Sequence, residues 1–493
     1  MRKDIVFFLA AIAGAGLYSW LFWRESMGVN TLLITVFLLA VTGRLQPGLF
    51  RQSAARWAGA GLLSSALLVV INNSMVAKSV HIASLALYIG VVQAPFLRFA
   101  WFSALLALHS ILRAPFAMVL EVLKGKKSGF RLRSIWNLAL LIAIPAFSVL
   151  FFSWLYYWSN NTFAALVDNI IASLPHWPAW NWPSGRIILA LLGASIVYAI
   201  GRANPLANKL EAWEAYLHPD LKRVRVKYWW GNSMMLLKQY YKISFYTLIS
   251  LNLLLLAVNL TDVATVWWGV VPESPAALSD FVHIGTYLLI FSILVAAFFV
   301  VVIFWDKLNF YPHNGPLKTA AMIWLAQNTL LALSVGARNY HYIAGYGLAY
   351  KRIGVLVFLL LTIIGLITLY IKVRDRKSLY FVMHTNTWAW YAIWLFCAIL
   401  NWDALITRYN LRYTRDNLDM PYLINDLSDK NLYILQQETA LIPKTSYYET
   451  QLDFKRERFE RKLSSSTWLS WNLPDEINRR ALKANERRLN QKQ

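Results

Sequence analysis

The residues best suited to chemistry lie in one stretch, Ala320 to Arg376, which is otherwise strongly apolar. Two adjacent amides, Gln327 and Asn328, stand in its first apolar run, and Arg338 follows about three helical turns later. Amides at such positions predict either a hydrogen bond that clasps two helices or part of a polar path leading to Arg338. Both interpretations require the amides to lie on a helix inside a membrane.

A cationic cluster follows these amides. It consists of Arg338, Lys351 and Arg352, with Tyr340, Tyr342 and Tyr346 between them. Guanidinium groups match the oxygens of carboxylates and phosphates, so the cluster predicts a site for an anionic head group. The alternative is that these cations pair with Asp403 or other acids of the C-terminal tail and dock the tail. The candidate polar and anion site comprises the amides and the cluster: Gln327, Asn328, Arg338, Tyr346, Lys351 and Arg352.

Weaker candidates lie elsewhere in the chain. His384, Thr385 and Asn386 stand together in the last apolar run, where a histidine beside an amide suits an acyl-transfer enzyme or simply bonds a neighbouring helix. Asp306 is expected to pair with Lys307 or to cap a neighbouring helix. The sequence contains no H-E-x-x-H, G-x-S-x-G, P-loop or G-x-G-x-x-G pattern. We therefore predict no catalytic residue, no cofactor and no metal site, and we favour a protein that is not an enzyme.

Composition places these residues in a membrane protein. The chain has 493 residues, of which 58% are hydrophobic and 15% are charged, whereas soluble domains carry about 25% charged residues. Tryptophans and tyrosines stand at the ends of many apolar runs, as expected at a membrane interface. The single cysteine, Cys397, excludes an internal disulfide and a site built from several cysteines. The fold class that follows is all-α, a polytopic transmembrane helical bundle.

Apolar runs of about 20 residues can cross the hydrocarbon layer as helices, and we predict about eleven of them, within a range of about 10–12. They lie at residues 5–23, 29–42, 57–72, 79–96, 136–158, 187–201, 243–260, 281–304, 319–336, 353–371 and 379–400. The first run is read as a span and not as a cleaved signal peptide. The central hairpin joins helices of roughly Ala320–Val335 and Ile353–Ile371 through a turn over Arg338–Arg352.

Residues 99–123 are the ambiguous segment. They are apolar enough to form a further span, but His109, Arg113 and Glu121 interrupt them. We place this segment as an amphipathic helix on the cytoplasmic face. Three regions result: residues 1–135 with the N-terminal spans and this helix, residues 136–400 with the core spans, and residues 401–493 as a soluble, mostly helical tail. Leu452–Leu463 and Pro474–Leu489 are predicted helices of the tail.

The distribution of basic residues sets the predicted orientation. The net charge is +23, and basic blocks at Lys124–Arg133 and Lys222–Lys242 lie between apolar runs. With a cytoplasmic N-terminus both blocks face the cytoplasm, as the positive-inside rule requires, and the tail lies outside it. Anionic lipids are the expected counter-charge. Nucleic acid is not an expected partner, whereas a membrane or extracytoplasmic protein partner is left open.

The hairpin resembles the signature of a known family. Its pattern of Arg338, Tyr346-Gly347-Leu348-Ala349 and Arg352 is similar to an Arg-…-Tyr-Gly-Leu-Thr-…-Arg pattern. That pattern belongs to a bacterial multi-pass inner-membrane family known only as a domain of unknown function. Ala349 stands where the family has threonine. Residues 401–428, which include Asp403 and Asn410, also resemble the segment after the last span of that family. The resemblance implies a multi-pass protein of the bacterial inner membrane and implies no reaction.

These observations leave three hypotheses for function. The first, which we favour, is a non-enzymatic scaffold, sensor or regulatory membrane protein whose tail binds something outside the membrane. The alternative is a transporter or flippase for an anionic or lipid-linked substrate, which needs a cavity that reaches Gln327 and Asn328. The third is a lipid-modifying transferase, which needs an acid or base such as His384 facing a lateral groove.

Overall fold

The computed structural model describes residues 2–124, 161–173, 184–223, 233–267, 275–305, 307–414, 418–438 and 445–490, with isolated positions between 145 and 158. Within these ranges the regular elements are helices, and no strand is present. This confirms the predicted all-α fold class. The chain divides into two compact units, which are described separately: Met1–Trp23 with His109–Arg202, and Arg24–Leu108 with Ala203–Gln493.

In the first unit, α1 (Arg2–Phe22) packs closely on α8 (Ser184–Gly201). A Cβ atom added to Gly14 would stand 2.5 Å from a methyl carbon of Val197, and one added to Gly193 would collide with the backbone of Gly14. The two backbones approach closely because these positions carry no side chain. α7 (Asn161–Ser173) belongs to the same unit. Most of the predicted span 136–158 lies outside the described residues.

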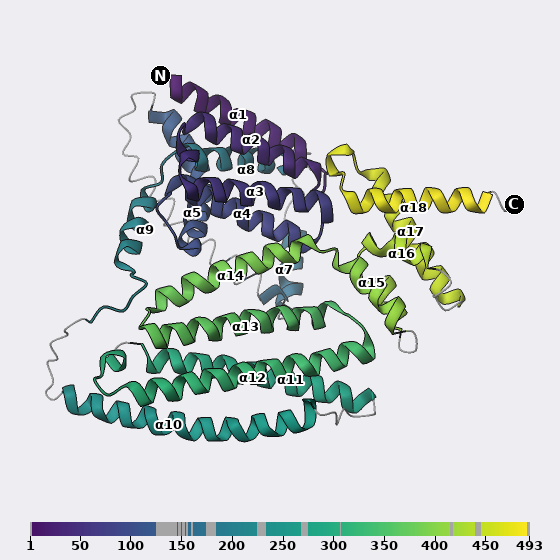
Figure 1. Ribbon diagram of the computed structural model, residues 1–493. Coiled ribbons are helices and arrows are strands. Elements are labelled where there is room, and N and C mark those ends of the chain that lie inside the picture. Colours follow the sequence, from purple (N-terminus) through teal and green to yellow (C-terminus); the bar gives the residue numbers. More distant parts are fainter. Residues whose placement is uncertain are drawn as a thin grey trace. The chain divides into compact units, whose positions relative to one another are not determined.

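The second unit contains the central hairpin. Its long helices are α2 (Val29–Leu45), α3 (Ser53–Asn72), α4 (Met75–Gln93), α9 (Pro205–Tyr216), α10 (Ser233–Asp262), α11 (Pro275–Ile303), α12 (Gly315–Tyr346), α13 (Tyr350–Asp375) and α14 (Leu379–Ile399). α12 packs against α10, α11 and α13, while α14 joins α13 to α3 and α4 (Figure 1). Buried apolar side chains such as Phe304, Leu325 and Val335 fill the space between these helices.

The lengths and compositions of the helices fit a multi-pass membrane protein. Among the described residues, seven helices are long and apolar enough to cross a membrane, or up to nine if each bent helix pair counts as one span. α2 and the segment Tyr287–Ile303 are shorter apolar helices. α5 (Ala100–Lys124) meets the same criterion over Ala100–Glu121. Its location on the cytoplasmic face therefore stays a prediction.

The hairpin is present, but its turn is shorter than predicted. α12 continues to Tyr346 and α13 begins at Tyr350, so the connection is only Gly347–Ala349. The prediction of a turn over Arg338–Arg352 is wrong, because no residue from 338 to 346 stops a helix. Gly347 does stop it: its φ of +79° lies in the left-handed region that glycine tolerates best.

The tail leaves the membrane helices by a sharp bend. α14 ends at Ile399, and α15 (Trp402–Tyr413) begins after the cap residue Asn401 at an angle of 64° to it. The remaining tail helices are α16 (Leu432–Gln437), α17 (Ser446–Ser465) and α18 (Leu473–Asn490), and the last two contain both predicted tail helices. Ile406, Leu423 and Leu435 pack in one cluster with Ile353 of α13. The tail therefore shares part of its core with the hairpin.

Candidate functional site

The three-residue turn of the hairpin is held by the tail. Asn410 of α15 accepts a hydrogen bond from Leu348 N at 2.6 Å and donates one to Leu348 O at 2.9 Å. A Cβ atom at Gly347 would collide with the amide of Asn410. The turn thus requires glycine at position 347 for two reasons, its φ angle and the space that Asn410 occupies. We name this contact among Gly347, Leu348 and Asn410 the clasp.

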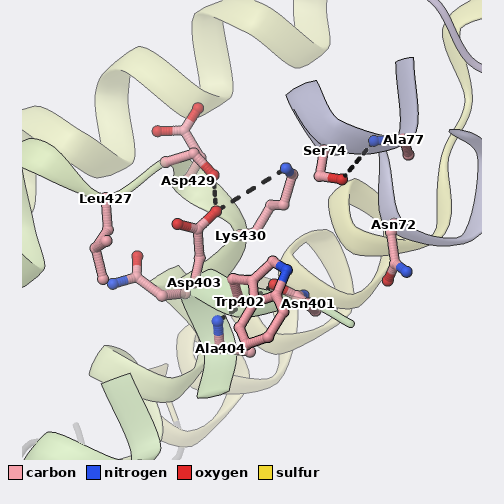
Figure 2. Close-up of polar contacts among 12 residues, drawn as sticks. Asn72, Ser74, Ala77, Asn401, Trp402, Asp403, Ala404, Leu427, Asp429 and Lys430 are labelled. Carbon is pink, nitrogen blue, oxygen red and sulfur yellow. Dashed lines mark hydrogen bonds and ion pairs between the residues drawn. The ribbon is translucent and has the colours of Figure 1, made fainter. Parts of the chain in front are cut away.

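A second contact beside the clasp involves the first residue of α13. Tyr350 donates its backbone N–H to the hydroxyl of Tyr422 at 3.0 Å and its own hydroxyl to Asp403 at 2.8 Å. The Asp403 carboxylate is 3% exposed and also accepts a hydrogen bond from Ser428. The ammonium group of Lys430 lies 3.9 Å from the same carboxylate (Figure 2). Asp403 therefore contacts the hairpin through Tyr350 and the rest of the tail through Ser428 and Lys430.

The cations of the predicted anion site have separate surroundings. Arg352 donates to the carbonyl oxygens of Tyr346, at 2.7 Å, and Gly347, and its guanidinium lies 4.3 Å from the centre of the Tyr342 ring. It stabilises the end of α12, where carbonyl groups lack helical partners. Lys351 is exposed to the surroundings. Docking of the tail by Asp403 uses Tyr350 and not Arg338, Lys351 or Arg352.

Polar side chains also connect α10 with α12 along their length, and we name this set the ladder. Asn252 donates to Ala320 O at 3.0 Å and accepts from Gln327 Nε2 at 3.1 Å. Asn259 donates to Gln327 O at 3.2 Å, and Asp262 forms an ion pair with Arg338. Along α12 these contacts extend from Ala320 to Arg338, towards the C-terminal end of the helix, where the turn begins. The ladder places polar residues of α10 beside Gln327 and Arg338 of α12.

Several acceptors of the ladder have no hydrogen-bond partner among the described residues. They are Asn259 Oδ1, Gln327 Oε1 and one oxygen of Asp262, and all three atoms are buried. Buried polar atoms of this kind are expected to bind water or a donor group. The α10 residues of the ladder were not predicted from the sequence. A signal for them exists, because Asn252, Asn259 and Asp262 are spaced by seven and three positions and so share one helix face.

The other candidate residues do not join the ladder. Asn328 is 2% exposed and donates to Trp324 O of its own helix at 2.8 Å. Asn386 of α14 donates to Thr368 of α13 at 2.7 Å, and this bond links two helices. His384 lies near Tyr380, with 5.6 Å between ring centres. Asp306 lies outside the described residues. The assignment of an anion site to the predicted residues stays a prediction.

An apolar groove lies beside the Tyr350–Asp403 contact. Its volume is about 340 Å³, a size typical of a ligand pocket. The walls come from the first turns of α13, the last turns of α14, Val76 of α4 and Trp402 of α15. Phe358 and Trp390 in these walls are 38% and 40% exposed, so the groove opens sideways between α13 and α14. We name this space the lateral groove.

One buried lysine lies inside the tail itself. Lys455 of α17 is 1% exposed, and its ammonium group donates to Leu427 O at 3.0 Å and to Leu423 O at 3.3 Å. Burial lowers the pKa of Lys455 to about 8. The carbonyl groups stabilise the ammonium form, but no carboxylate among the described residues forms an ion pair with it. Loss of the proton above about pH 8 removes the cost of burying this charge, so the contribution of Lys455 to the stability of the tail rises at alkaline pH.

The long apolar helices and the buried polar contacts between them define a multi-pass integral membrane protein. The model of a family described as a domain of unknown function (DUF4153) matches residues 5–437. The chain belongs to this family, since the match covers more than half of its length. No curated protein and no solved structure matches the chain. The Tyr-Gly-Leu signature of the hairpin stays a prediction, although the structure explains why Gly347 and Leu348 are needed there.

Proposed function

We propose that this protein is a non-enzymatic scaffold or regulatory protein of the bacterial inner membrane, whose helical bundle holds the C-terminal tail in a fixed position for a partner. The observation that carries the proposal is the rigid attachment of the tail. The clasp and the Tyr350–Asp403 contact form one attachment, and they use directional, partly buried hydrogen bonds. A tail that only needed a flexible linker would not require them.

A second attachment lies at the loop between α1 and α2. Ser470 of the tail accepts a hydrogen bond from Ser26 N at 2.9 Å, and Val29 N donates to Trp471 O at 3.0 Å. A Cβ atom at Gly28 would stand 2.6 Å from the carbonyl oxygen of Ser470. Two separate attachments prevent rotation of the tail about either one. This supports a role in which the orientation of the tail matters.

The surface that the tail offers to a partner includes a basic row on α18. Arg480, Lys483 and Arg487 are exposed and are spaced by three and four positions, so they share one helix face. Such a row fits an acidic surface on a protein partner. We place this partner outside the cytoplasm, in the orientation that the positive-inside rule favours.

The proposal is tested with a photo-crosslinking residue at Lys483 in the full-length protein, expressed in the bacterial membrane. We expect a discrete adduct that weakens when Gly347→Ala loosens the clasp. A crosslinking residue at the exposed Tyr447 of α17 is the control for non-specific collision. Equal adducts at Lys483 and Tyr447, or an adduct insensitive to Gly347→Ala, would count against a scaffold that depends on a fixed tail.

The transporter hypothesis is favoured by one observation, the buried acceptors of the ladder that lack partners among the described residues. A chain of such atoms suits water or a polar head group that moves along α10 and α12. The test is movement of a fluorescent anionic lipid between leaflets of proteoliposomes. A transporter predicts faster movement with the wild type than with Gln327→Leu, whereas a scaffold predicts no movement above that of empty vesicles.

A further inference from the structure

One segment of the tail exposes apolar side chains while it buries polar ones. It begins at the short helix η8 (Trp468–Ser470) and continues into the first turns of α18. Its exposed apolar side chains, which we name the apolar patch, are Trp468 at 61%, Trp471 at 42%, Leu473 at 38% and Ile477 at 37%. Their polar neighbours Asn472 and Asn478 are only 2% and 0% exposed. A helix surrounded by water shows the opposite arrangement, so lipid or protein is expected to cover the patch.

A backbone hydrogen bond fixes the level of the patch against a membrane helix. Trp471 O accepts from the N–H of Val29, the first residue of α2, at 3.0 Å. α2 has 17 residues, which is about 26 Å along a helix and less than the ~30 Å of the hydrocarbon layer. The ends of a span this short lie at the edge of that layer. Trp471 therefore lies at the level where the hydrocarbon meets the lipid head groups.

The patch lies next to exposed apolar side chains of two membrane helices. Leu33, one helical turn after Val29 on α2, is 37% exposed, and Ile71, in the last turn of α3, is 46% exposed. η8 contacts α2, and α18 contacts α3, so the patch begins where these two helices end (Figure 1). Tryptophan is enriched at this depth of a membrane, because its ring is apolar and its N–H is polar. These observations favour lipid over protein as the material that covers the patch.

We propose that the apolar patch lies in the interfacial layer of the membrane, in the leaflet on the side of the tail, and holds the base of the tail against lipid. The contact is apolar, so it does not require anionic lipids. The patch ends where the basic row begins, because Arg480 follows Ile477 by three positions on the same face of α18. Only the part of the tail beyond the patch is then surrounded by water. The inference goes beyond the scaffold role and does not rest on it, since it needs no protein partner.

The test is a fluorescent label at the patch, in the full-length protein in nanodiscs of phosphatidylcholine. Cys397→Ser removes the single cysteine, and Trp471→Cys then carries a bimane label. The bond from Val29 is to the backbone of residue 471, so this substitution leaves it in place. The control is a label at the exposed Arg487→Cys, which lies about 21 Å beyond Leu473 along α18. We expect nitroxide groups on the lipid head groups to quench the label at 471 several-fold more than the control, and aqueous iodide to quench it several-fold less.

A second measurement tests whether the contact holds the tail. Ile477→Glu places a charge in the patch, at a position where a substitution facing water would change stability little. At the membrane interface the charge opposes the lipid contact. We therefore expect trypsin to release the tail faster from this variant in nanodiscs than from the wild type. Phe454→Glu is the matched control, because Phe454 of α17 is an exposed apolar residue of the tail outside the patch, and this variant should release the tail at the wild-type rate.

Any of three results overturns the proposal. If iodide and the nitroxide lipids each quench the label at 471 as they quench the control, the patch faces water. If the label is shielded from iodide but is not quenched by the nitroxide lipids, a protein surface such as a second copy of this chain covers the patch. Equal release of the tail from Ile477→Glu and Phe454→Glu shows that the patch does not hold the tail. If Trp471→Cys does not fold, a label at Ile477→Cys decides by the same two comparisons.

Discussion

The clasp and the ladder use the same chemistry with opposite results. In the clasp, both polar ends of the Asn410 amide bond one residue, Leu348, at 2.6 and 2.9 Å. In the ladder, Asn259 and Gln327 use their donors, but Asn259 Oδ1 and Gln327 Oε1 have no partner among the described residues. Both polar atoms of the Asn410 amide thus have a hydrogen-bond partner in the clasp, whereas the ladder contains acceptor atoms without one among the described residues.

This difference distinguishes a contact that fixes the structure from a set of polar residues that can still bind water or a ligand. A fully satisfied buried network fixes one geometry, and loss of any member leaves a group without a partner. A network with spare acceptors can bind water or a moving ligand, and loss of one amide removes an unsatisfied atom together with its bond. The clasp therefore explains the fixed tail, whereas the ladder places polar groups with spare acceptors between Gln327 and Arg338.

The largest effect is expected at the ion pair of the ladder. Asp262→Ala leaves Arg338, which is 8% exposed, as a buried charge without its carboxylate. Removal of one partner of a buried pair costs about 3–5 kcal/mol. Melting of the detergent-purified variant measures this loss, and Asp262→Leu with Arg338→Met should recover most of it. Asp375→Ala, at a more exposed ion pair, is the control and should change little. If Asp262→Ala melts like the wild type, the Asp262–Arg338 ion pair does not contribute to stability as predicted.

The next effect is expected at the clasp. Gly347→Ala must place a side chain in the left-handed region, at about 1–2 kcal/mol, and must also displace Asn410. Asn410→Ala removes both bonds to Leu348 and should cost about 1–3 kcal/mol. The double variant should lose less than the sum, because the collision disappears with the Asn410 side chain. Melting and trypsin release of the tail measure the losses. Gly336→Ala, whose added Cβ meets only Leu359 at 3.8 Å, is the control, and strict additivity would contradict the contact.

Within the tail, Lys455 predicts a dependence of stability on pH. Its pKa in the folded protein is about 8, below the ordinary value of 10.5. Between these values the unfolded state binds more protons, so the contribution of Lys455 to stability rises with pH, by at most about 1.4 kcal/mol per unit. Below pH 8 the full cost of its charge is present. Urea unfolding of the wild type and Lys455→Met between pH 7 and pH 10 measures this slope as a difference, and parallel curves would contradict it.

The smallest effect is expected at Gln327. Gln327→Leu loses the bond to Asn252, but it also removes an acceptor that has no partner among the described residues. Hydrogen bonds between membrane helices contribute about 0.6 kcal/mol on average, so melting should change by no more than this. Asn386→Leu, which loses a bond to Thr368, is the matched comparison. A much larger loss at Gln327 would show that the ladder is a closed network like the clasp.

Part of the candidate site could be predicted from the sequence. Residues with extreme properties were found, because Gln327 and Arg338 stand out within an apolar run. Their partners, Asn252 and Asp262, could not be predicted because they lie far away in sequence on another helix. A single sequence does not determine which face of that helix turns towards α12. The same reason explains Asp403, which was matched with the cations of the hairpin and instead accepts from Tyr350.

The sequence by itself determined the all-α fold class, the multi-pass membrane character, the hairpin and the helical tail. The spans follow from local chemistry, since an apolar run long enough to cross a bilayer must satisfy its backbone as a helix, and the tail helices follow from their apolar spacing and end signals. Tertiary structure decided the end of α12, the clasp, the ladder and the lateral groove. These depend on which faces of separate helices meet, and that choice is made by the packing of residues far apart in the chain, such as Gly347 with Asn410.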